Sequence, residues 1–142
     1  MRVFFYGTLM DADVRARVVG ASLIEPARLA GWRRVGLIGR PYPVIVHAPG
    51  AETAGLLARA IDRAGWRRLL AYEGDEYRVI AVRVTAADGC AISALTFAAS
   101  AAARPGPRLW SFDGWHRRHK QTMLAPLRGP RRAARSRRTA QR

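Results

Sequence analysis

Two short stretches of the sequence carry residue types that could do chemistry together. The first is Tyr6-Gly7-Thr8-Leu9, which ends the bulky apolar run that starts at Val3. A glycine there can adopt a positive φ and let a ligand approach the backbone closely. A strand, a tight turn and a helix start also aim unpaired backbone N–H groups at one spot, and such a spot binds anions. The alternative is that Gly7 simply makes a turn, because a single short glycine motif is weak evidence.

The second stretch contains Glu73, an acid placed where the helical pattern predicts an apolar residue. Asp62 is a good N-cap for a helix over 63–72, whose apolar face is formed by Trp66, Leu69 and Leu70. Glu73 lies four residues after Leu69 on that same face. A buried carboxyl group with a raised pKa could carry a proton, whereas the alternative is a surface glutamate at a frayed helix end. The residues alone leave both interpretations open.

The rest of the chain must position these two stretches, and its pattern predicts short helices and strands. The expected elements are a strand from Val3, a helix over 14–19, a glycine-interrupted strand over 28–38, a strand over 44–46, strands over 76–84 and 90–98, and a final helix over 111–124. The glycines within 28–38 suggest bends that curl a sheet into a barrel. Turns are expected at 47–50 and 88–89, and a linker over 99–107. Residues 53–61 fit a helix as well as a strand.

An ordered set of motifs resembles the gamma-glutamylcyclotransferase-like (AIG2-like) family. The motifs are Tyr6-Gly7-Thr8-Leu9, Tyr42-Pro43 before a strand, Tyr72-Glu73-Gly74, Tyr77-Arg78, and Trp110 with Trp115. The resemblance spans roughly residues 2 to 124, and the order of the set makes it specific, since each motif alone is weak. We therefore predict an α+β domain with a curved, mostly antiparallel sheet or small β-barrel flanked by short helices. The resemblance also makes 53–61 a strand.

The resemblance implies cyclisation of a γ-glutamyl amine or peptide, a small-molecule substrate. The substrate's own α-amine attacks its γ-carbonyl and releases 5-oxoproline and a free amine, with no cofactor and no metal. By resemblance and by position, Glu73 would be the catalytic proton shuttle. The backbone N–H groups of Gly7, Thr8 and Leu9 would cradle the substrate's carboxylate or the developing oxyanion.

Four further residues are candidates for the substrate pocket. Tyr6 would pack on the glutamyl part or hydrogen-bond to it. Tyr42, Tyr77 and Arg78 would line the pocket, and the alternative roles are buried tyrosines with hydrogen-bond partners and an arginine on a strand face. The sequence departs from the family pattern at Leu70, where relatives commonly have an aspartate. Such departures bear on the identity of the substrate rather than on the type of reaction.

The charge is concentrated in the last residues of the chain. Seven arginines and no acid lie in residues 128–142, so residues 1–127 carry +8 of the net charge of +15. We expect a domain over 1–127 and a disordered tail over 128–142. The tail could contact nucleic acid weakly and non-specifically through phosphates, or it could be a solvated tail without a dedicated partner. A catalytically silent relative that binds a small ligand, with this tail on an acidic partner, is the alternative function.

The remaining features predict a cytoplasmic protein without a membrane span or a metal site. No apolar run approaches the roughly 20 residues that a membrane span needs, and no signal-peptide pattern opens the chain. The single cysteine, Cys90, cannot form an internal disulfide. His116 and His119 could share a metal, but Lys120 and the arginines beside them favour a solvated basic face.

Overall fold

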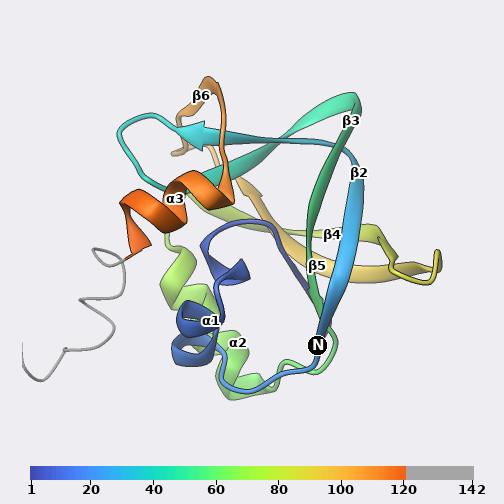
Figure 1. Cartoon of the computed structure of the whole chain (residues 1–142). Coiled ribbons are helices and arrows are strands. Elements are labelled where there is room, and N and C mark those ends of the chain that lie inside the picture. The colour runs from blue at the N-terminus through green and yellow to red at the C-terminus, as the bar shows by residue number, and fades with distance from the viewer. Residues whose placement is uncertain (121–142) are drawn as a thin grey trace, which may run out of the picture.

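Six strands form one sheet in the computed structural model, which describes residues 1–120 (Figure 1). They are β1 (Val3–Phe5), β2 (Ile24–Leu37), β3 (Pro43–Ala58), β4 (Tyr77–Ala86), β5 (Ala91–Ala99) and β6 (Pro105–Leu109). Their order is β3-β1-β5-β4-β2-β6, and an additional pairing of β2 with β3 closes five strands into a barrel. Every pairing is antiparallel except that of β1 with β5. The prediction of an α+β domain with a curved, mostly antiparallel sheet is confirmed.

Short helices lie together on one side of this barrel (Figure 1). They are the 3₁₀ turn η1 (Thr8–Met10) and the α-helices α1 (Ala12–Val18), α2 (Arg63–Glu73) and α3 (Phe112–Arg118). Each α-helix begins after a residue whose side chain accepts a hydrogen bond from a backbone N–H, namely Asp11, Asp62 or Ser111. The N-cap predicted at Asp62 is therefore confirmed. The end of the helix predicted up to 124, the domain boundary at 127 and the tail over 128–142 lie outside the described residues.

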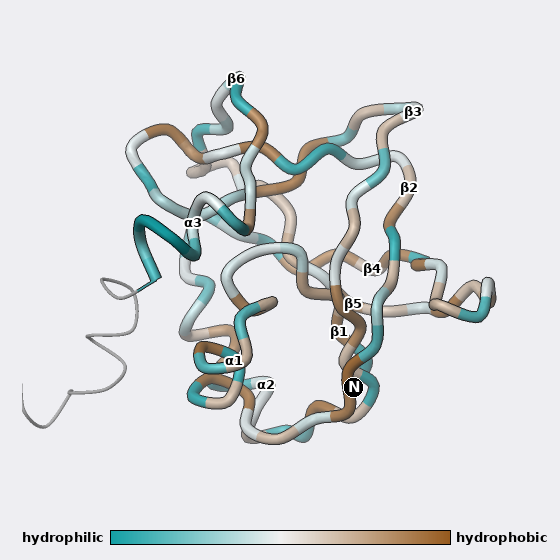
Figure 2. Tube along the Cα trace, viewed as in Figure 1, coloured by the Kyte–Doolittle hydropathy of each residue, from teal (hydrophilic) through white to brown (hydrophobic). Residues whose placement is uncertain are grey.

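The first strand is buried on both faces, as its run of bulky apolar residues predicts. Val3, Phe4 and Phe5 are at most 3% exposed. Phe4 points into the barrel, where it packs with Leu29, Ile45, Leu57 and Val84. Val3 and Phe5 face the helices and pack with Leu9, Val14, Leu69 and Trp115. Figure 2 shows this hydrophobic strand at the centre of the fold, so β1 joins the two halves of the core.

Two predicted boundaries are wrong, and both concern strands that continue through turn residues. β3 does not end at the turn expected over 47–50, because Gly50 adopts a φ of +86° and the strand bends and continues to Ala58. Part of the predicted 99–107 linker is the strand β6, which pairs with β2 between Val35 and Leu109. Its prolines are tolerated because a strand paired on one side only needs few backbone donors. The bend predicted within 28–38 occurs at Gly31, where the register of β2 with β3 shifts.

The close pairing of β3 with β1 requires a glycine at position 55, which gives a first prediction. A Cβ on Gly55 would lie 2.3 Å from the carbonyl oxygen of Phe5 and 2.7 Å from the ring of Phe4. We expect Gly55→Ala to lower the free energy of unfolding by about 1–3 kcal/mol or more, measured by urea denaturation. The neighbouring Ala54→Ser, at an exposed position, is the control. Equal stability of the two variants would contradict this account of the pairing.

No helix within residues 1–120 has both the length and the apolar character needed to span a membrane.

Candidate active site

A cavity of about 270 Å³ lies between the opening turn, the start of β3 and the end of α2. Its aromatic walls are Phe4, Phe5, Tyr6, Tyr42, Tyr72, Tyr77 and Phe97. The remaining lining residues are Gly7, Thr8, Leu9, Pro43 and Glu73. The volume is near the lower end of the roughly 300–1,000 Å³ that is typical of ligand sites, so the cavity suits a small ligand.

The opening turn needs a glycine because of a close neighbour, not because of a positive φ. Gly7 has a φ of −124°, so the expectation of a positive φ is wrong. A Cβ on Gly7 would lie 2.9 Å from Cγ and 3.2 Å from Cδ of Pro43, the first residue of β3. The bare backbone at Gly7 therefore lets the turn and β3 meet at the wall of the cavity.

The backbone of the opening turn leaves three N–H groups without a partner inside the turn. The carbonyls of Gly7 and Thr8 accept hydrogen bonds from the N–H groups of Met10 at 3.0 Å and Asp11 at 3.1 Å. The N–H groups of Gly7, Thr8 and Leu9 come before these bonds, and within residues 1–120 none of them donates to another backbone group outside the regular elements. Since all three residues line the cavity, their N–H groups are the donors available to a negatively charged ligand.

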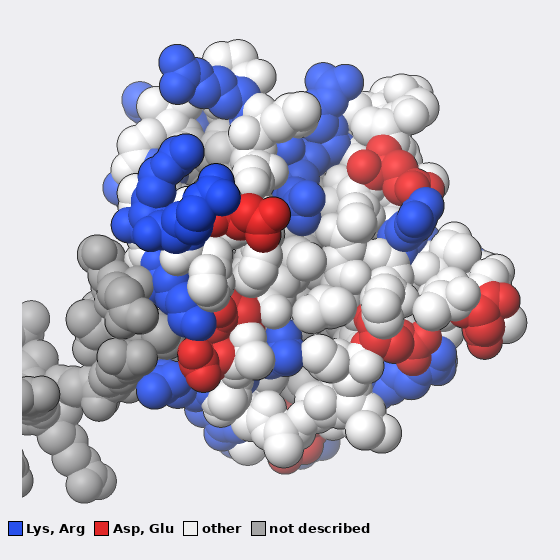
Figure 3. Space-filling view, in the orientation of Figure 1, with Lys and Arg blue, Asp and Glu red and all other residues white. Residues whose placement is uncertain are grey.

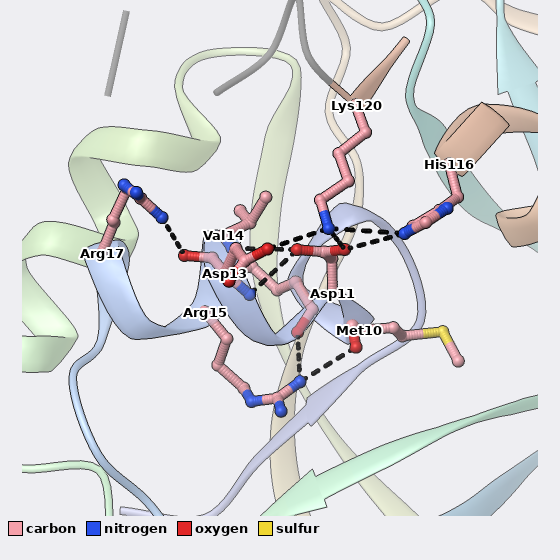
Figure 4. A network of polar contacts seen from close by, with 9 residues as sticks. Met10, Asp11, Asp13, Val14, Arg15, Arg17, His116 and Lys120 are labelled. Atoms are coloured by element: carbon pink, nitrogen blue, oxygen red, sulfur yellow. Dashed lines mark hydrogen bonds and ion pairs between the residues drawn. The ribbon is translucent and has the colours of Figure 1, made fainter. Parts of the chain in front are cut away.

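Side chains from α1 and α3 fix the far side of the turn (Figure 4). Asp11 accepts hydrogen bonds through Oδ1 from the N–H groups of Asp13 and Val14, and its Oδ2 pairs with Nζ of Lys120 at 2.9 Å. Nε2 of His116 also lies 3.5 Å from that oxygen. Figure 4 also shows Arg15, whose Nη1 donates to the carbonyls of Leu9 at 3.1 Å and Met10 at 3.0 Å. These contacts therefore hold the end of the opening turn against α1 and α3.

Glu73 is the last residue of α2, and its side chain reaches the cavity. Gly74 follows with a φ of +72° and ends the helix. Leu69, one turn earlier, is fully buried, as the helical pattern predicts, although Leu70 is 42% exposed and does not belong to the apolar face. Burial raises the pKa of the Glu73 carboxyl from 4.5 to about 8. A carboxyl group with this pKa can both accept and donate a proton near neutral pH.

A hydrogen bond between two hydroxyl groups joins the opening turn to the end of α2. Oγ1 of Thr8 lies 2.8 Å from the hydroxyl of Tyr72, the residue before Glu73. Burial raises the pKa of Tyr72 to about 12, so this hydroxyl stays neutral. The contact therefore ties the residue that precedes the carboxyl group to the turn that carries the free N–H groups.

The other tyrosines of the cavity use their hydroxyls to hold its walls. Tyr6 donates to the carbonyl of Phe97, and Tyr77 donates to the carbonyl of Pro43 at 2.5 Å. Burial raises the pKa of both phenols, so they remain donors. Tyr42 donates to Oε1 of Glu76 at 3.1 Å, and that oxygen also pairs with Arg40.

The structure brings together all the predicted site residues except Arg78. Gly7, Thr8, Leu9 and Glu73 line the cavity with the three predicted tyrosines Tyr6, Tyr42 and Tyr77. The prediction that Arg78 lines the pocket is wrong, because its side chain is exposed and donates through Nε to the carbonyl of Ala99. Neighbouring residues of a strand point to opposite faces, so Arg78 faces away from the cavity that Tyr77 lines.

Sequence reasoning did not select Tyr72 or Phe97 as site residues. Tyr72 could have been selected, because it is the aromatic residue directly before Glu73 in one of the motifs. Phe97 lies within β5 and carries no local signal that separates it from any other buried strand residue. No group of three or more His, Cys, Asp or Glu side chains within residues 1–120 is arranged to hold a metal ion.

The cavity is lined by the opening turn and by one acid, Glu73, whose carboxyl pKa is raised, so the site suits a small ligand. The sequence matches the family model described as "Gamma-glutamyl cyclotransferase, AIG2-like" over residues 3–117, and the chain belongs to this family. The chain is 31% identical over 125 residues to AIG2-like protein A of Arabidopsis thaliana. This match covers 86% of this chain and 76% of that protein.

Solved structures agree with this assignment. A solution structure of an Arabidopsis thaliana protein superposes with a TM-score of 0.67 at 29% identity, covering 87% of this chain and 85% of that one. A structure described as a gamma-glutamyl cyclotransferase superposes with a TM-score of 0.62 at 20% identity, covering 75% of this chain and 71% of that one. At that identity the second likeness shows the shared fold alone.

Proposed function

We propose that this protein is an enzyme that cyclises a γ-glutamyl amine or peptide, releasing 5-oxoproline and a free amine. One observation carries the proposal: Glu73, whose carboxyl has a raised pKa, lines the same small cavity as Gly7, Thr8 and Leu9, whose N–H groups have no partner inside the turn. The family match supports it, and no cofactor takes part in the proposed reaction.

The reaction needs no nucleophile from the protein. The substrate's α-nitrogen forms a bond to its γ-carbonyl carbon, and the bond from that carbon to the leaving nitrogen breaks. Two protons pass from the α-ammonium nitrogen to the leaving nitrogen, and Glu73 accepts and returns them. The N–H groups of the opening turn bind the substrate's carboxylate or the oxyanion that forms on the γ-oxygen. The aromatic walls exclude water and hold the glutamyl chain folded, so that the amine and the carbonyl meet.

The test is to measure 5-oxoproline release from a panel of γ-glutamyl amines and γ-glutamyl dipeptides. We expect at least one member to be cyclised, and the leaving amine of the best member identifies the substrate class. If purified, folded protein releases no 5-oxoproline from any member, the proposal is wrong.

The pH dependence of the reaction gives a second prediction. As a base, Glu73 must be deprotonated in the free enzyme, and burial raises its pKa to about 8. We therefore expect kcat/KM to rise with pH along a titration curve whose midpoint lies near 8, and to reach a plateau above it. Because the substrate's ammonium also titrates, the control is an NMR titration of the labelled Glu73 carboxyl in the free protein. A carboxyl midpoint near 4.5, the ordinary value, would contradict the proposed role.

The alternative function is a silent relative that binds a small ligand and an acidic partner. Figure 3 shows Lys and Arg side chains gathered over β6 and α3, which is a surface that suits an acidic partner. A Glu73 side chain turned to solvent would favour the silent relative, whereas Glu73 lines the cavity, and this supports the enzyme. Weak contact of the arginine-rich tail with nucleic acid and a cytoplasmic location stay predictions.

A further inference from the structure

A single arginine outside the cavity holds the first peptide bond of the opening turn. Nη1 of Arg34, on β2, donates to the carbonyl of Tyr6 at 3.0 Å and to the carbonyl of Ala54 at 3.2 Å. The guanidinium carbon also lies 5.7 Å from the centre of the ring of Trp110. Arg34 thus sits where β2, β3 and the opening turn meet, and it does not belong to the residues that line the cavity.

The direction of the Tyr6 carbonyl fixes the direction of the next N–H group. The peptide bonds of the described residues are trans, so the carbonyl of Tyr6 and the N–H of Gly7 point in opposite directions from one planar unit. Arg34, which does not line the cavity, binds this carbonyl from outside it. We propose that Arg34 is a positioning residue for the cyclisation, which keeps the N–H of Gly7 directed into the cavity toward the reacting substrate. This inference rests on the proposed function.

Trp110 holds Arg34 in the position that this role requires. The indole Nε1 of Trp110 donates to the carbonyl of Pro41 at 2.9 Å. Its ring packs against Phe112 and Trp115, with centroids 6.4 and 6.5 Å away. The guanidinium has little freedom, because it lies over the anchored ring of Trp110 and donates to the carbonyls of Tyr6 and Ala54. A lysine could donate to one carbonyl as a point charge, but it could not stack on the ring with a planar group.

The neighbouring Arg33 gives a matched control, because it is exposed and faces the opposite side of β2. We expect Arg34→Met to lower kcat/KM for 5-oxoproline release about 10- to 100-fold, as for a donor displaced from a reacting group. Arg34→Lys should recover part of this loss, and Arg33→Met should stay within about twofold of the wild type. A fall in kcat assigns the Gly7 N–H to the oxyanion, and a rise in KM assigns it to the substrate's carboxylate.

A second readout separates this inference from the proposed function. In ¹H–¹⁵N NMR spectra of the unliganded proteins, we expect the Gly7 amide resonance to move in Arg34→Met and to stay in place in Arg33→Met. If the wild type releases no 5-oxoproline, the proposed function fails and this resonance alone decides the positioning role. Wild-type kcat/KM together with an unmoved Gly7 resonance in Arg34→Met would overturn the inference.

A substitution of Trp110 tests the same inference in case Arg34→Met does not fold. Trp110→Leu leaves Arg34 and the opening turn intact but removes the ring that holds the guanidinium. We expect kcat/KM to fall about tenfold, with a moved Gly7 resonance and an unchanged circular dichroism spectrum. Unchanged kinetics and an unmoved resonance in this variant would contradict the inference.

Discussion

Glu73→Gln should lower the rate of 5-oxoproline release about 10²- to 10⁴-fold, which is the usual contribution of a positioned acid–base group. The amide of glutamine fills the same space at the wall of the cavity but cannot take a proton from the substrate's ammonium. The loss should fall on kcat, because substrate contacts with the turn and the aromatic walls remain. The control is Glu52→Gln at an exposed glutamate paired with Arg28, for which we expect a change within about twofold.

Although Glu73→Gln should lower activity, it should raise the free energy of unfolding at alkaline pH. In the unfolded chain Glu73 loses its proton near 4.5, while the folded protein retains it up to about 8. The folded state binds the additional proton between these values, so wild-type stability falls as the pH rises through this window. Glu73→Gln lacks this loss and should be more stable than the wild type at pH values above the window. Wild-type activity in Glu73→Gln, or stability profiles that coincide, would contradict the assignment.

Gly7→Ala should lower kcat/KM about 100-fold, since a displacement of the turn by a few tenths of an ångström or more misplaces its N–H groups. The added Cβ would lie 2.9 Å from Cγ of Pro43, so either the turn or the start of β3 must move. The control is Gly114→Ala in α3, where a Cβ would meet its nearest neighbours at 3.7 Å, an ordinary contact distance.

A second substitution tests whether the contact with Pro43 causes this effect. Pro43→Ala removes the ring atoms that the new Cβ would meet. In the double variant Gly7→Ala with Pro43→Ala we therefore expect at least tenfold recovery of kcat/KM over Gly7→Ala alone, measured by 5-oxoproline release. Full activity of Gly7→Ala, or no recovery in the double variant, would show that the close approach of the turn to β3 does not matter.

Local signals in the sequence predicted the parts of the fold that depend on local physics. Asp11, Asp62 and Ser111 cap α1, α2 and α3, as short polar side chains before helical segments do. The apolar run from Val3 gave the central strand. The continuous β3 was missed because the chain bends at Gly50 without ending the strand. The proline-containing β6 was missed because its pairing partner in β2 is distant in the sequence.

The residues of the candidate site also fall into those that a local motif predicted and those that it did not. The opening turn and Glu73 were found because each belongs to a short motif, and the cavity joins them. Arg78 was misplaced although the alternation of a strand places it opposite Tyr77, so this error could have been avoided. Arg34 lies in a strand with no motif of its own, and its contact with Tyr6 spans 28 residues of sequence. Only the fold could reveal it.

The most direct test of the account is the crystal structure of Glu73→Gln with an uncleaved γ-glutamyl amine bound. We expect the substrate's α-nitrogen to lie about 3–3.5 Å from its γ-carbonyl carbon and beside the side chain of residue 73. An oxygen of the γ-carbonyl or the α-carboxylate should accept hydrogen bonds from the N–H groups of Gly7, Thr8 or Leu9. A substrate bound away from these groups, or bound there with its chain extended so that amine and carbonyl cannot meet, would contradict the account.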